Sequence, residues 1–78
     1  MTYEEAVKII PLGHYRHFKG NEYEVIGIAR HSETTEPIVI YRALYDEGTL
    51  WCRPAAIWNE TIERDGKEFQ RFKKIEVN

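Results

Sequence analysis

The stretch YEVIGIARH-SETTEP-IVIYRALY, residues 23–45, sets two apolar runs on either side of a short polar loop. Both runs are rich in β-branched and aromatic residues, a pattern typical of a long antiparallel hairpin. The second run is apolar at both alternating sets of positions, so we expect a central strand that is covered on both faces. From this patterning we expect a core made of Phe18, Ile26, Ile28, Ile40 and Leu44.

Before and after this hairpin the sequence predicts a short helix and further short strands. Residues 2–10 begin with the capping pattern Thr-x-x-Glu and repeat apolar residues at helical spacing. We therefore expect a helix there that docks on the sheet. The remaining expected elements are strands at 15–18, 49–53, 61–64 and from 69 to about 72, and a helical turn from 55 to about 60.

These elements favour a mainly β fold, a small and strongly bent antiparallel barrel of the SH3-like kind with five or six strands. The apolar phase switches between Val25 and Ile26, next to Gly27, which predicts a β-bulge that helps the sheet to bend. The alternative is an α+β fold, an open antiparallel sheet with the helix packed on it. The length predicts one domain, residues 1–78, with a helical extension at 1–12 and the barrel at 13–78.

Composition narrows the function classes. The chain has 11 basic and 13 acidic residues and a formal net charge of −2, which argues against unspecific nucleic-acid binding. Cys52 is the single cysteine, so an internal disulfide is impossible, and we expect a small buried side chain in a cytoplasmic protein. No apolar run is long enough to span a bilayer, and the acidic N-terminal segment does not look like a signal peptide.

Five motifs occur in order: YRHFKG at 15–20, HSET at 31–34, VIYRALY at 39–45, WCRP at 51–54 and RF at 71–72. Together they resemble a family of small bacterial proteins known as domain-of-unknown-function family 1653. The resemblance implies a bacterial cytoplasmic protein that stands alone or is fused to other domains, and it implies no activity, cofactor or catalytic residue. The chain departs from the family at residues 46–48, where a Gly-Asp pair is expected, and at Trp58, where Phe is usual.

The loop after the second expected strand concentrates polar groups. His31 and Glu33 could ligate a metal or act as an acid–base pair, and the Ser32 hydroxyl could bind an anion. Equally, such residues bond to nearby backbone and fix a turn. His17 is the histidine that could share a metal with His31 across paired strands, but the spacing fits no zinc pattern, so we expect no metal and no cofactor. Ser32 also lacks the G-x-S-x-G elbow of a nucleophile.

Arginines lie among aromatic residues in the expected strands. Arg42 shares its phase with apolar neighbours, so it should be half-buried and paired with Glu24 or Glu36. The alternative is a pocket in which Arg42 or Arg53, walled by Tyr41 and Trp51, receives a carboxylate, a phosphate or a peptide. Arginine suits such planar recognition, and aromatic side chains provide the wall.

We therefore predict a non-catalytic interaction module that binds a peptide, a protein partner or a small anionic ligand through an aromatic and arginine surface. A single-stranded nucleic-acid-binding barrel is the alternative, because aromatic residues interleaved with arginine also describe a base-stacking surface. An enzyme is the third class, and no catalytic set is recognisable for it. A homodimer stays open. The candidate ligand-binding residues are His17, His31, Ser32, Glu33, Tyr41, Arg42, Trp51 and Arg53.

Overall fold

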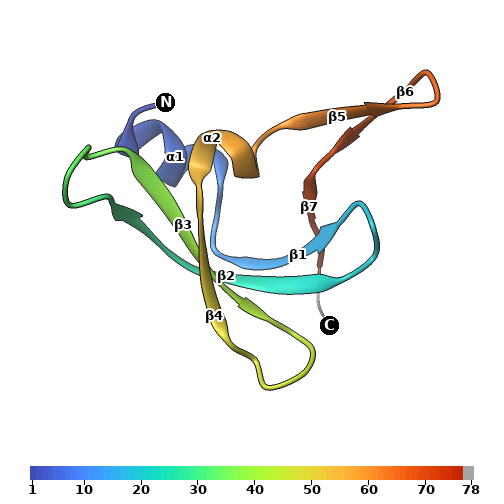
Figure 1. Ribbon diagram of the computed structural model, residues 1–78, viewed down its shortest axis with the longest axis horizontal. Coiled ribbons are helices and arrows are strands. Elements are labelled where there is room, and N and C mark those ends of the chain that lie inside the picture. Colours follow the sequence, from blue (N-terminus) through green and yellow to red (C-terminus); the bar gives the residue numbers. More distant parts are fainter. Residues whose placement is uncertain (77–78) are drawn as a thin grey trace.

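The computed structural model describes residues 1–76, which form a short helix, a bent antiparallel sheet and a projecting hairpin (Figure 1). The elements in chain order are α1 (Tyr3–Ile9), β1 (Gly13–His17), β2 (Glu22–Arg30), β3 (Pro37–Ala43), β4 (Leu50–Pro54), α2 (Ala55–Trp58), β5 (Thr61–Arg64), β6 (Lys67–Gln70) and β7 (Phe72–Lys74). No helix within residues 1–76 is long and apolar enough to cross a membrane.

The main sheet has the strand order β4-β3-β2-β1-β7, and every neighbouring pair in it is antiparallel. Strands β5 and β6 form a separate two-stranded sheet that projects away from α1 (Figure 1). The prediction of a mainly β, antiparallel fold with a short N-terminal helix is confirmed. A closed barrel is not, because in residues 1–76 the main sheet stays open between β4 and β7, as in the alternative open-sheet arrangement.

The predicted β-bulge lies in β2. The register between β2 and β3 shifts between Val25 and Gly27, so Ile26 is the extra residue of the bulge. Before the bulge Val25 points into the core, and after it Ile28, opposite Val39, packs against the same core. The bulge therefore keeps both halves of β2 packed on one core while it bends the strand.

The expected core lies largely on the wrong face of the sheet. Ile26 and Leu44 are 38% and 41% exposed, and Phe18, Ile28 and Ile40 are only partly buried. The core is instead built from one set of alternating positions together with residues of the helices and of β7. Its members are Ala6, Ile10, Tyr15, Val25, Val39, Tyr41, Ala55, Trp58 and Phe72.

Strand β3 explains the difference. Its buried positions are Pro37, Val39, Tyr41 and Ala43, while Arg42 on the other face is exposed. We call the face that carries Val39 and Tyr41 the inner face, and the opposite one the outer face. The helices cover only the inner face, so the expectation that β3 is covered on both faces is wrong.

Helix α1 begins as predicted. The hydroxyl of Thr2 accepts the Glu5 backbone N–H at 3.1 Å, and the Glu5 carboxylate accepts the Thr2 backbone N–H at 2.9 Å. The hydrogen bond from the Thr2 backbone N–H, and after it the Thr2 side chain, lower the pKa of Glu5 because they stabilise its charged carboxylate. A helix of seven residues is unstable alone, and Ala6 and Ile10 anchor it in the core of its own sheet.

Two aromatic rings link the open edges of the sheet. Trp58, at the end of α2 directly after β4, stacks on Phe72 of β7 with ring centroids 3.7 Å apart and planes at 1°. Phe72 was expected at the end of one long last strand, but the chain divides at Arg71, whose N–H donates to the Glu60 carbonyl at 2.9 Å. Because of this division, β6 stays with β5 and β7 pairs with β1.

The Trp58–Phe72 stack gives a stability prediction. Trp58 is 2% exposed, so Trp58→Ala should lower the free energy of unfolding by about 3–5 kcal/mol, whereas Trp58→Phe keeps a stacked ring and should cost clearly less. Leu44→Ala is the control, because a partly exposed side chain outside such features changes stability by about 0.5 kcal/mol or less. Urea unfolding measures all three, and a similar loss for Trp58→Ala and Leu44→Ala would contradict this assignment of the core.

Candidate functional site

The sheet brings some of the predicted site residues to one face. Tyr41 lies opposite Trp51, and Val39 lies opposite Arg53, in the β3–β4 pairing. Directly opposed residues of antiparallel strands project from the same face, so Trp51 and Arg53 share the inner face with Tyr41. His17 joins them there, because it lies opposite the core residue Phe72 in the β1–β7 pairing.

Arg42 and Cys52 lie elsewhere. Arg42 points from the outer face, is exposed, and forms no ion pair with Glu24 or Glu36 among residues 1–76. The predicted half-buried ion pair is therefore wrong, because the described part of the chain places no layer over the outer face and an exposed guanidinium needs no partner. Cys52 is exposed instead of buried for the same reason, since it shares the outer face with Ile40.

The predicted loop residues His31, Ser32 and Glu33 are separated from this cluster. His31 Nδ1 accepts the backbone N–H of Glu33 at 3.1 Å and that of Thr34 at 3.4 Å, which favours the interpretation of this loop as a structural turn. The loop follows the last residue of β2, whereas His17 lies beside the first residues of that nine-residue strand. A strand of that length spans roughly 30 Å, so His17 and His31 are too far apart to share a metal. Within residues 1–76, no group of three or more His, Cys, Asp or Glu side chains is placed to hold a metal ion.

Helices α1 and α2 lie over one end of the inner face, away from the β3–β4 turn (Figure 1). Side chains at the end toward that turn are partly exposed. The partly exposed residues at this end are His17, Tyr23, Tyr45, Trp51 and Arg53, which we call the open inner face. Phe72, with 6% of its surface exposed, forms its floor.

Aromatic contacts hold the open inner face together. The Tyr23 ring lies 5.7 Å from the Phe72 ring and 5.6 Å from the Tyr45 ring, both in edge-to-face geometry. The hydroxyls of Tyr23 and Tyr45 are hydrogen-bonded at 2.9 Å. Burial, and then this hydrogen bond, raise the pKa of Tyr23, so its phenol stays protonated at neutral pH.

Arg53 provides the charge of this face. Its guanidinium carbon lies 5.5 Å from the centre of the Phe72 ring, and the His17 ring packs edge-on against the same ring at 4.9 Å. The ion pairs among residues 1–76 use Arg16, Arg30 and Arg71, so Arg53 has no carboxylate partner in this part of the chain. The site thus presents a half-buried cation on an aromatic floor, with no counter-charge from residues 1–76.

The charge of Arg53 affects the pKa of His17. The pKa of His17 is lowered mainly by its partial burial, and the positive charges of Arg53, Arg71 and Lys19 lower it further. The imidazole is therefore neutral at pH 7. Its Nδ1 accepts the Lys19 backbone N–H at 3.2 Å, which places the ring proton on Nε2 and gives the site another donor.

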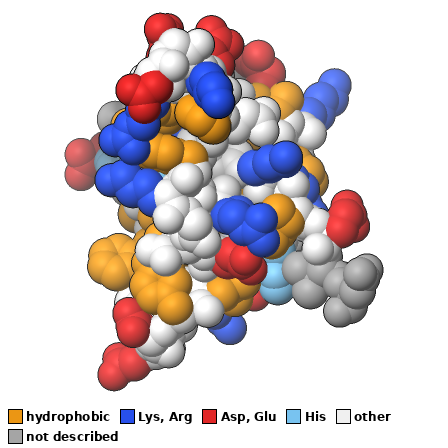
Figure 2. Space-filling model, turned by 90° about the vertical axis from the view of Figure 1, so that its right-hand side faces the viewer, with side chains coloured by type: hydrophobic (Ala, Val, Ile, Leu, Met, Phe, Trp, Pro, Cys, Tyr) orange, Lys and Arg blue, Asp and Glu red, His pale blue; other side chains and the backbone are white. Residues whose placement is uncertain are grey.

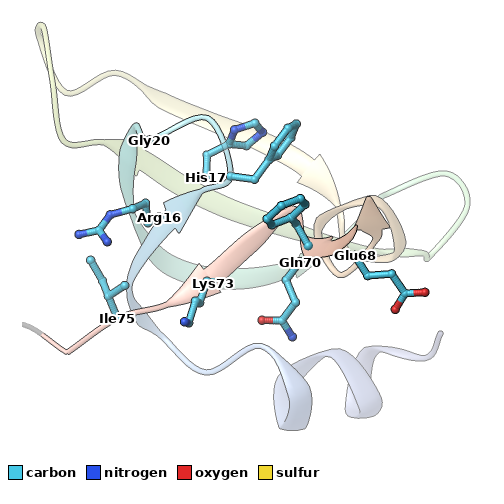
Figure 3. Close-up of a pocket in the computed structure, with 9 residues that line it drawn as sticks. Arg16, His17, Gly20, Glu68, Gln70, Lys73 and Ile75 are labelled. Atoms are coloured by element: carbon cyan, nitrogen blue, oxygen red, sulfur yellow. The ribbon is translucent and has the colours of Figure 1, made fainter. Parts of the chain in front are cut away.

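A hollow lies beside this site, at the hairpin of β5 and β6 (Figure 3). It is a groove of about 430 Å³ between the end of β1, β6 and β7. In Figure 3 the Glu68 carboxylate points away from Arg16 and Lys73, so the labelled charges do not converge on one point. The lining residues are Arg16, His17, Phe18, Gly20, Glu68, Phe69, Gln70, Lys73 and Ile75.

Sequence reasoning missed this groove, because its shape depends on how the projecting hairpin lies against β1. The one sign of the groove in the sequence is Phe69, an apolar residue in an otherwise polar strand. In the structure the Phe69 side chain is 42% exposed. His17 is the one predicted site residue in its wall.

Comparison with known proteins agrees with the motifs noted above. Residues 13–74 match the family described as "Protein of unknown function (DUF1653)". The chain belongs to this family. A crystal structure of a DUF1653 protein from Bordetella bronchiseptica is 35% identical to it and superimposes with a TM-score of 0.80, covering 88% of this chain and 91% of that one. No curated protein matches the chain.

The site electrostatics of this DUF1653 chain give a second prediction. Arg53→Gln should raise the pKa of His17 toward its ordinary value, because the largest neighbouring charge is removed, and Lys19→Gln should raise it less. NMR titration of the His17 ring measures both. A His17 pKa that does not change in Arg53→Gln would place Arg53 away from the imidazole.

The sign of the accompanying stability change follows from the same shift. The folded-state pKa of His17 is lower than that of the unfolded chain, so the unfolded chain binds the proton more readily. His17 therefore costs stability as the pH falls through about 6.5 and on to its folded-state pKa. The cost should be smaller in Arg53→Gln, which urea unfolding at pH 7 and pH 5 would measure.

Proposed function

We propose that this DUF1653 chain is a non-catalytic binding module that takes a carboxylate or another small anion, free or carried by a peptide, on its open inner face. The observation that carries the proposal is Arg53, a half-buried guanidinium on the Phe72 ring with no carboxylate partner among residues 1–76. Charged side chains taken partly out of water are normally paired, and arginine presents a planar fork that matches a carboxylate or phosphate.

The neighbours of Arg53 support an anionic ligand. Arg71 is already paired with Glu60 at 3.2 Å, so it adds positive potential without being the free contact. His17 and the hydrogen-bonded pair of Tyr23 and Tyr45 add neutral donors. Positive charge, donors and aromatic walls together are the usual components of a site for a small anion.

The other function classes have less support. Ser32 lies in the distant β2–β3 loop, and Cys52 points from the outer face, so neither nucleophile shares a site with His17. For nucleic acid, Trp51 and Arg53 could stack bases. However, acidic side chains lie among the Lys and Arg side chains on the face in Figure 2, so the basic groups on this face make no continuous stripe for a phosphate backbone.

We also infer that the bent sheet is an opened form of an SH3-like barrel. The Trp58–Phe72 stack spans the gap between β4 and β7, where a closed barrel would have hydrogen bonds. One domain and a reducing, cytoplasmic setting fit a short chain whose single cysteine is an exposed free thiol.

The test is anion binding by the intact chain and by two matched arginine variants. Acetate, citrate and inorganic phosphate are titrated into labelled protein and followed by NMR shifts of β4 and of the His17 ring. Arg53→Gln should weaken binding by about tenfold or more, because it removes a charge-assisted hydrogen bond. Arg42→Gln removes an exposed arginine from the outer face of the same sheet and should leave binding unchanged.

Equal losses in the two variants would show unspecific charge attraction and refute the site. Labelled single-stranded and double-stranded oligonucleotides form the second arm of the experiment. Weak binding that disappears at physiological salt is expected. Micromolar binding that survives physiological salt would replace the proposed function with the nucleic-acid alternative.

A further inference from the structure

Strand β4 has one side without a partner strand among residues 1–76. The Ala43 N–H donates to the Thr49 carbonyl at 3.3 Å. Because backbone groups alternate in direction along an antiparallel ladder, residues 51 and 53 also direct theirs toward β3. Leu50, Cys52 and Pro54 therefore direct their backbone groups to the free side. Proline, which has no N–H, stands in one of these outward positions, as expected for an edge.

The two edges of the main sheet differ in how they are protected. The edge strand β7 carries Lys73 and Lys74, and lysine is a common device that prevents further strand pairing. Strand β4 has no lysine, and its pairing with β3 runs without a register shift. Its residues Leu50, Trp51 and Cys52 are all exposed. Strand β4 is thus an open template for an added strand.

The side chains of β4 specify what such a strand would carry. Trp51 and Arg53 project from the inner face, and residues of an added antiparallel strand opposite them would have Cβ atoms about 5 Å away. Since Arg53 lacks a carboxylate partner among residues 1–76, the complementary residue opposite it is Asp or Glu. Two residues further along the added strand, an apolar or aromatic side chain would meet Trp51.

We propose that β4 binds an extended acidic peptide segment as an added antiparallel strand, with the pattern acidic–any–apolar placed against Arg53 and Trp51. The inference rests on the proposed function, because the peptide carboxylate occupies the anion site at Arg53. It adds recognition of the peptide main chain by Leu50 and Cys52, a mode in which hydrogen bonds supply affinity and alternate side chains supply specificity.

A second copy of the chain fits this edge less well. The β4 sequence LWCRP contains no acidic residue, so pairing of two β4 strands puts no carboxylate of the partner strand opposite Arg53. The charge complementarity therefore favours a peptide from another protein.

The experiment uses the full chain and the capped peptide Thr-Val-Glu-Thr-Phe-Val-Thr, with binding measured by calorimetry. Replacing Glu by Lys in the peptide should abolish binding, and Arg53→Gln in the protein should weaken it about tenfold or more. Cys52→Pro removes an outward N–H that β3 does not use, so it should remove peptide binding while acetate still binds. Cys52→Ser is the matched control and should bind the peptide normally.

A second arm avoids any change to the protein. N-methylation of the peptide at alternate residues should abolish binding in one phase and leave it intact in the other, because only one phase of amides faces β4. Hydrogen exchange of the Leu50 and Cys52 amides should slow when the peptide binds.

The outcomes separate the two ideas. If neither acetate nor peptide binds, the proposed function fails and this inference fails with it. If acetate binds through Arg53 but the peptide gains nothing from its main chain, with equal affinity in both N-methylation phases, only the added strand is refuted. If the peptide still binds to the Arg53→Gln variant, the proposed pairing of the peptide's acidic residue with Arg53 is refuted. Dimerisation of the chain that Cys52→Pro prevents would assign the edge to a second copy.

Discussion

The contact on which the structure most depends is the stack of Trp58 on Phe72. A five-stranded sheet with two free edges has a thin core when it is built from so short a chain. The stack joins the helical turn after β4 to β7 across the gap, and Tyr15 and Tyr41 pack against Trp58 at 5.4 and 4.9 Å. Aromatic burial thus holds the two edges in place without backbone pairing, and the floor of the open inner face depends on it.

The elements that sequence reasoning located correctly all have local signals. The capping residues Thr2 and Glu5 start α1, and the phase switch before Gly27 marks the bulge in β2. The prediction of the core residues was wrong because both alternating sets of positions in β3 are apolar. Which of the two faces is buried then depends on where the helices pack. The break between β6 and β7 at Arg71 was not predicted either, because neither glycine nor proline marks it in the sequence. Non-local packing decided both.

The site shows the same contrast between features with a local sequence signal and features that depend on non-local packing. Of the residues predicted to form an arginine and aromatic pocket, Tyr41, Trp51 and Arg53 share a face because they have a common phase on paired strands, whereas Arg42 lies on the other face. The histidine loop was interpreted from its residue types alone. In the structure His31 Nδ1 accepts two amides of its own turn, and residue type gives no sign of that choice. The groove beside the β5–β6 hairpin depends on tertiary packing and had only Phe69 as a sign.

The turn of the projecting β5–β6 hairpin is suited to accept an inserted segment. Its turn residues Asp65 and Gly66 both have positive φ, 55° and 75°, the conformation of a two-residue turn that matches the twist of the strands. The strands on either side are exposed except for the partly buried Ile62, so few core contacts cross this loop. Lengthening a surface loop costs little closure entropy. This turn is therefore the place at which a whole second domain could be inserted while the aromatic core and the edge strand β4 keep their geometry.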